Sequence, residues 1–200
     1  MNLNFIIPKN IKSFVDANRQ MIFFVARVMA IYFFWKFMVW FLGEESHPID
    51  ERMWPWLSHK WEIFNDWVRI GLLYSTSALF DLFGYPNTII NNYRLFVHNY
   101  AIIGVGNYCL GIQLWIFFAA LISSYPGYWK KKIIYSIIGV IGINLINIWR
   151  LSVLVFAVKY YPEYVKFNHD YVFNVIVYIF TFAMWYYIVQ KNKLAIPEKK

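Results

Sequence analysis

The sequence contains little charge of either sign, and acidic residues are scarce. Charged residues make up 15% of the 200 residues, and only 11 of them are Asp or Glu; ordinary soluble domains carry about 25% charged residues. Hydrophobic residues reach 60%, more than a chain of this length can bury, because small domains leave much of their surface exposed. A soluble globular protein is therefore excluded, and so is intrinsic disorder, which requires a low apolar content. The composition predicts an integral membrane protein.

Cysteine is almost absent. The single residue, Cys109, excludes an internal disulfide, so its thiol is either a small buried group or a reactive one. One Cys without a spaced set of further ligands is a poor zinc signal, and we expect neither a metal nor another cofactor. The formal net charge of +8 does not indicate nucleic-acid binding, because the excess Lys and Arg residues lie in short clusters beside apolar segments.

Long apolar runs dominate the rest of the sequence. A membrane-spanning helix needs about 20 mostly apolar residues. Residues 21–42, 110–125, 133–158 and 171–190 meet this requirement. We therefore predict an all-α polytopic membrane protein, with about four transmembrane helices in a single membrane domain over residues 1–200.

The positive charges predict how these helices are oriented. They gather before the first span (Lys9, Lys12, Arg19), between the second and third (Lys130, Lys131, Lys132) and after the fourth (Lys191, Lys193, Lys199, Lys200). Cytoplasmic loops carry an excess of Lys and Arg. We expect a multi-pass protein of the cytoplasmic (inner) membrane, with both termini in the cytoplasm and residues 43–108 forming an outer segment.

The outer segment combines apolar and charged residues. Residues 61–83 are apolar but are interrupted by Glu62, Asp66, Arg69 and Asp81, so we expect an amphipathic or re-entrant helix on the outer face. Whether residues 61–84 span, re-enter or lie on the membrane stays open. Further on, residues 93–97 and 100–105 flank an Asn turn and predict a short β-hairpin.

Three chemically capable residues fall at one membrane level. Cys109 begins the second span, and His169 lies in the outer loop just before the fourth. Arg150 lies about 17 residues into the third span, which at 1.5 Å per residue is roughly 25 Å above the cytoplasmic side. A thiol, a guanidinium and an imidazole are thus expected near the outer edge of the membrane, on three neighbouring elements.

This trio suits acyl transfer. A helix N-terminus or a nearby cation favours the nucleophilic thiolate, histidine can move the proton, and arginine can stabilise an oxyanion. The backbone N–H groups of Leu110 and Gly111 are candidate further donors. We expect Asn144 and Asn147, at three-residue steps before Arg150, to orient the guanidinium.

Each residue also has a simpler interpretation. A lone Cys in a membrane helix commonly serves packing, Arg150 can be an anchor that snorkels to the interface, and His169 can be an exposed loop residue. The two asparagines can join helices by hydrogen bonds.

Three sequence blocks resemble those of the exosortase/archaeosortase family. They are Tyr-Cys-Leu-Gly-Ile at 108–112, Asn-Ile-Trp-Arg-Leu at 147–151 and Asn-His-Asp at 168–170. The chain is similar to a compact, four-span subtype of these membrane cysteine enzymes. The resemblance implies a Cys109 nucleophile completed by Arg150 and His169, with Gly111 and Asp170 belonging to the same blocks.

The resemblance also implies a substrate. It would be an exported protein whose C-terminal sorting signal has a short motif, a hydrophobic helix and a basic cluster. The enzyme would cut near the motif on the outer face, through a Cys thioester, as a protease/transpeptidase with the lipid bilayer around it. A non-catalytic membrane assembly or transport subunit, with Arg150 paired to a partner helix, is the alternative.

Overall fold

A computed structural model describes residues 18–41, 54–125 and 127–192. Among the predicted features, residues 43–53 of the outer segment and the basic residues Lys9, Lys12, Lys193, Lys199 and Lys200 lie outside the described residues.

Within the described residues, four helices are long and apolar enough to cross a membrane, which confirms the predicted fold class. They are α2 (Arg19–Phe41), α4 (Ile112–Ser124, extended to 18 residues by the turn that precedes it), α5 (Trp129–Tyr160) and α7 (Phe173–Asn192). Their lipid-facing character is clearest in α2, where only Val28 and Val39 are buried. A mostly apolar helix that is not buried in protein suits a hydrocarbon environment.

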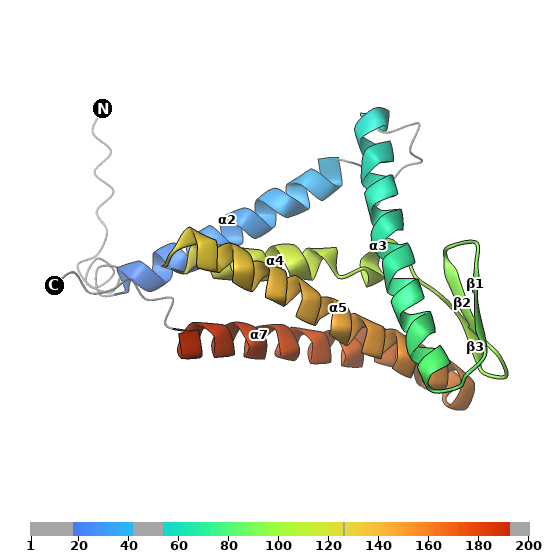
Figure 1. Ribbon diagram of the computed structural model, residues 1–200. Helices are drawn as coiled ribbons and strands as arrows, with labels where there is room; N and C mark the ends of the chain where they lie inside the picture. Colours follow the sequence, from blue (N-terminus) through green and yellow to red (C-terminus); the bar gives the residue numbers. More distant parts are fainter. Residues whose placement is uncertain (1–17, 42–53, 126, 193–200) are drawn as a thin grey trace.

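The four candidate spanning helices run alongside one another, and Figure 1 shows which of their ends lie together. The start of α2, the turn between α4 and α5 and the end of α7 lie at one end of the bundle. Arg19 and the lysines at 130–132 lie at this end. The structure therefore gathers the described positive clusters at the end opposite α3 and the sheet.

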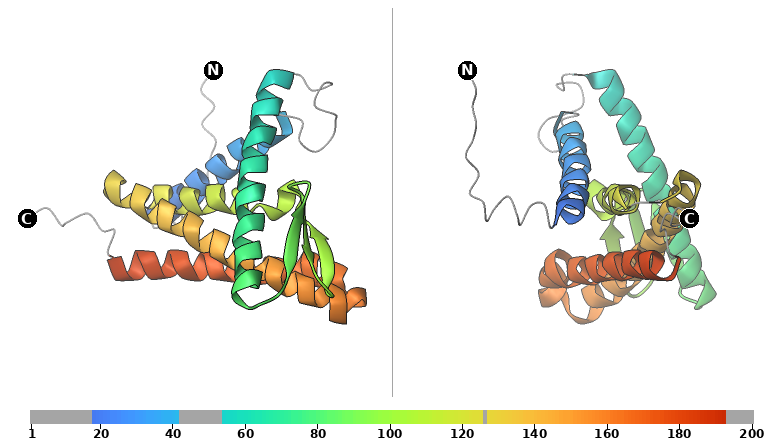
Figure 2. Two further views of the ribbon diagram at one scale, coloured as in Figure 1. Left: turned by 45° about the vertical axis from the view of Figure 1, so that its right-hand side comes forward. Right: turned by 90° about the vertical axis from the view of Figure 1, so that its left-hand side faces the viewer.

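Helix α3 (Pro55–Leu82) lies across the far end of the bundle, and two views show this crossing (Figures 1 and 2). Its proline lies in the first turn, where the missing N–H costs nothing. Its buried residues recur every three or four positions (Ser58, Asn65, Arg69, Leu72, Leu73, Thr76, Phe80). This spacing marks one face of a helix, and that face packs on α5 and the sheet. A membrane that encloses the four spans would leave α3 along its surface.

The predicted hairpin is present within a larger sheet. Strands β1 (Asn87–Ile90), β2 (Arg94–Val97) and β3 (Ala101–Gly104) form an antiparallel sheet in the order β1-β2-β3. Asn91, Asn92 and Asn99 take positive φ in the two turns, a conformation that asparagine tolerates better than most residues. Strand β1 was not predicted, because its four residues between Pro86 and the asparagine turn show no clear alternation of apolar and polar side chains.

The largest apolar core lies where α3, the sheet and α5 meet. It contains Leu73 of α3, Leu95 and Val97 of β2, and Val155 of α5, all fully buried. Leu110 belongs to the same core and is also fully buried. The chain around Cys109 is thus anchored from the C-terminal side by an apolar contact.

Candidate active site

Cys109 lies in a short, tightly hydrogen-bonded turn. The turn is a 3-10 helix, Asn107–Cys109, in which the Cys109 N–H donates to the Gly106 carbonyl at 2.9 Å. The Leu110 N–H donates to the Asn107 carbonyl at 3.2 Å. This corrects one expectation: the Leu110 N–H already serves the turn and is not a ready donor for a substrate oxyanion.

Gly111 joins this turn to α4 in a conformation that few other residues adopt. Its φ is +78°, in the left-handed region, and it forms the N-cap of α4. A Cβ at this position would lie 2.3 Å from Nδ2 of Asn147. The backbone conformation therefore favours glycine here, and a larger residue would also displace the Asn147 side chain.

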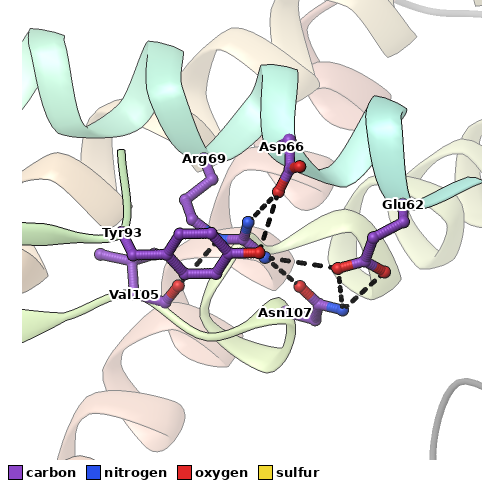
Figure 3. Close-up of polar contacts among 6 residues, drawn as sticks. All are labelled: Glu62, Asp66, Arg69, Tyr93, Val105 and Asn107. Carbon is purple, nitrogen blue, oxygen red and sulfur yellow. Dashed lines mark hydrogen bonds and ion pairs between the residues drawn. The ribbon is translucent and has the colours of Figure 1, made fainter. Parts of the chain in front are cut away.

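A buried arginine holds the residues just before Cys109 (Figure 3). Arg69 of α3 is 1% exposed, and its Nε donates to the Val105 carbonyl at 2.9 Å. Its two terminal nitrogens donate to Asp66 and to Oδ1 of Asn107. Its guanidinium also lies 4.1 Å from the ring centre of Tyr93.

The carboxylate of Glu62 closes this network. Its two oxygens accept from Nδ2 of Asn107 at 3.4 and 3.5 Å, and Oε1 lies 3.9 Å from Nη2 of Arg69. Both ends of the Asn107 amide are thus engaged, two residues before Cys109. From the sequence, these charges were interpreted only as interruptions of an apolar run. Their spacing of four and three residues, however, places Glu62, Asp66 and Arg69 on one helix face.

His169 lies beside the thiol. Its Nε2 is 3.3 Å from Sγ of Cys109, within hydrogen-bond distance for sulfur. His169 was predicted to lie in a loop, but it lies in a π-helical segment, Asn168–Val172, continuous with α7. The backbone is therefore helical from His169 into α7. π-Helical turns of this kind often occur at functional sites.

Arg150 approaches the same histidine from α5. Its Nη2 lies 3.5 Å from the backbone carbonyl of His169, and the residue is 8% exposed. The structure therefore brings the Cys109 thiol to the His169 imidazole and the Arg150 guanidinium to the backbone of the same residue.

The two asparagines of α5 behave differently from each other. Asn144 donates to the Val140 carbonyl at 2.8 Å, one turn back in its own helix. Asn147 is 1% exposed, and neither polar atom of its side chain has a hydrogen-bond partner among the described residues. The expectation that both orient the Arg150 guanidinium is thus not met. For Asp170, the structure describes the backbone in the π-helical segment.

A cavity of about 220 Å³ adjoins the cysteine turn. Its wall includes Tyr108 and Gly111, which flank Cys109, together with Asn147 and Arg150 of α5. Trp35 of α2 closes another side.

A comparison with protein families matches residues 53–187 to the model for transmembrane exosortases. The chain belongs to the transmembrane exosortase family. No similar protein was found among curated proteins, and none among solved structures.

The exosortase match covers α3, the sheet and the site, and it begins after α2. Cys109, Arg150 and His169 all lie inside it. The Arg69 network also lies inside the matched region, whereas Trp35, which closes one side of the cavity, lies outside it.

Proposed function

We propose that this exosortase is a membrane-embedded cysteine protease/transpeptidase that cleaves C-terminal sorting signals of exported proteins at the outer face of the cytoplasmic membrane. The distance of 3.3 Å between Sγ of Cys109 and Nε2 of His169 carries the proposal. A nucleophile and a base within hydrogen-bond reach are the requirement for activated thiol catalysis.

The first half-reaction forms a thioester. His169 takes the thiol proton, and the sulfur of Cys109 attacks the carbonyl carbon of the scissile peptide bond. The C–N bond then breaks, and the leaving amine accepts the proton from His169. The N-terminal part of the substrate stays attached to sulfur, and the hydrophobic C-terminal signal is released.

The second half-reaction restores the enzyme. An amine acceptor or water attacks the thioester carbonyl and gives its proton to His169. The C–S bond breaks, and His169 returns this proton to the sulfur of Cys109, which regenerates the thiol. The Arg150 guanidinium at the cavity wall supplies fixed positive charge for the oxyanion formed in both steps.

The nucleophile is tested by changing one atom. The substrate is a tagged exported protein that ends in a hydrophobic helix and a Lys/Arg cluster, co-expressed with the enzyme. We expect Cys109→Ser to insert and accumulate normally but to leave this protein unprocessed, because a hydroxyl is a far weaker nucleophile than a thiolate. The parent enzyme should also accumulate a substrate adduct that hydroxylamine releases.

Histidine substitutions provide the matched control. His169→Ala should abolish processing, whereas His98→Ala, at an exposed histidine beside a strand turn, should retain it. Undiminished processing by Cys109→Ser would overturn the enzyme assignment and favour a non-catalytic membrane subunit.

A further inference from the structure

The cavity beside Cys109 contains hydrogen-bonding groups that the protein leaves unused. Both polar atoms of the Asn147 amide are buried without a partner among the described residues, and so is Nε1 of Trp35. Both side chains line the cavity. A buried polar group without a partner costs about 1–3 kcal/mol, so a ligand that enters this cavity and pairs with these groups would recover that free energy.

A neighbouring amide shows the contrast. Asn107 also lines the cavity, but its oxygen accepts from Arg69 and its nitrogen donates to Glu62 (Figure 3). Asn107 is therefore a fixed part of the wall. Asn147, on the opposing helix α5, still has both a donor and an acceptor to offer.

The space is too large for one bridging water. One buried water needs a cavity of at least about 10–15 Å³, and this cavity, of about 220 Å³, has room for several waters or for one organic group that displaces them. The wall is also partly apolar, with the indoles of Trp35 and Trp61 in edge contact at 5.5 Å between ring centres. The cavity suits an organic group larger than water.

The chemistry of the unused groups selects that organic group. A primary amide donates from Nδ2 and accepts at Oδ1, which complements the C=O and N–H of a peptide backbone. A phosphate or carboxylate would satisfy the donors but would face the carbonyl oxygen of Asn147 with a second acceptor. An acyl chain would leave all three groups unpaired.

We propose that Asn147 and Trp35 form a subsite that binds the main chain of the substrate next to the scissile bond. Asn147 pairs with one backbone amide, and the indole N–H of Trp35 donates to a further carbonyl. Gly111 leaves room for the subsite, because a side chain there would occupy the place of the Asn147 amide. This inference rests on the proposed function for the identity of the ligand as a polypeptide.

Binding without chemistry tests the subsite. The protein is the full chain with Cys109→Ala, and the probes are synthetic peptides of the C-terminal signal of the tagged exported protein. We expect Asn147→Leu, similar in size but apolar, to weaken peptide binding about ten- to hundredfold, which corresponds to losing one buried amide pairing. Trp35→Phe, which removes the indole N–H, should weaken it about tenfold.

Matched variants remove the same groups elsewhere. Asn144→Leu changes an asparagine one turn away that bonds within its own helix and does not line the cavity. Trp115→Phe removes another buried, unpaired indole N–H that lies outside the cavity wall. Both should bind the peptide within about twofold of the parent.

Ester-substituted peptides locate the contact. Replacing one peptide N–H at a time by an ester oxygen removes the group that would donate to Oδ1 of Asn147. At one position near the cleavage site, the ester should weaken binding to the parent but not to Asn147→Leu, as expected for two groups that contact each other.

The outcomes separate this inference from the proposed function. Parent-like binding by Asn147→Leu and by Trp35→Phe, or no ester position that depends on Asn147, overturns the subsite even if Cys109 proves catalytic. Asn147-dependent binding together with normal processing by Cys109→Ser supports the subsite and overturns the proposed chemistry.

Discussion

Two buried arginines of this protein, Arg69 and Arg150, differ in their hydrogen bonding. Each of the three guanidinium nitrogens of Arg69 donates to a protein group, a carbonyl, a carboxylate and an amide, so this arginine serves structure. Arg150 makes one long hydrogen bond to a carbonyl and lines the cavity beside Cys109. A buried guanidinium that retains donors toward a cavity is suited to act on a substrate.

Substitution by lysine distinguishes an anchoring role for Arg150 from a chemical one. Lysine keeps the charge and also snorkels, so a mere anchor would tolerate it. If the planar set of donors stabilises an oxyanion, Arg150→Lys should insert normally but process substrate at least about a hundredfold more slowly, since one such donor contributes about 10²–10³ in rate. The measurement is turnover of the tagged exported protein, normalised to enzyme level in the membrane. Near-normal turnover would reduce the proposed triad to Cys109 and His169.

At the scale of elements, α3 works as a brace across the end of the bundle. It packs on α5 and the sheet, and its Arg69 holds the chain at Val105 and Asn107. The position of the Cys109 turn therefore depends on a helix residue that precedes Asn107 by 38 positions in the sequence. A brace of this kind makes the site sensitive to changes far from the thiol.

Removing the Arg69 guanidinium should lower the stability of the protein. We expect Arg69→Met to lower the free energy of unfolding by about 1–3 kcal/mol, because the Val105 carbonyl and the Asn107 oxygen lose a buried donor. The check is thermal unfolding of the detergent-solubilised protein, compared with Arg94→Met at an exposed arginine of β2. Equal melting temperatures for the two variants would contradict a bracing role.

At the scale of the whole molecule, the two ends of the bundle differ in kind. One end carries Arg19 and the lysines at 130–132, and the other carries α3, the sheet and the candidate active site. The positive-inside rule predicts that the basic end is cytoplasmic and that the candidate site faces the outside. The proposed processing of exported proteins requires this orientation.

Single cysteines introduced into the Cys109→Ala background test this orientation. A thiol reagent that does not cross membranes should label Ile102→Cys, at an exposed position of β3, in intact cells. It should label Lys131→Cys, in the basic turn region, only after the membrane is opened. External labelling of Lys131→Cys would reverse the topology.

The amino-acid sequence by itself determined the membrane class, the four spans and the family resemblance. Apolar runs of spanning length have no stable place in water, so composition and run length suffice for that conclusion. The positions of Cys109, Arg150 and His169 along the predicted spans likewise indicated that they lie at one level, because helix rise converts residue number into depth.

Only the tertiary structure decided which groups touch. It placed the His169 imidazole against the thiol and Arg150 against the backbone of His169. It also separated Asn147, left unpaired at the cavity, from Asn144, bonded within its helix. These two asparagines look alike in sequence, and so do Arg69 and Arg150 as isolated charges in apolar segments. Their partners come from helices and turns distant along the chain, and side-chain pairing across such distances depends on packing geometry that no local pattern encodes.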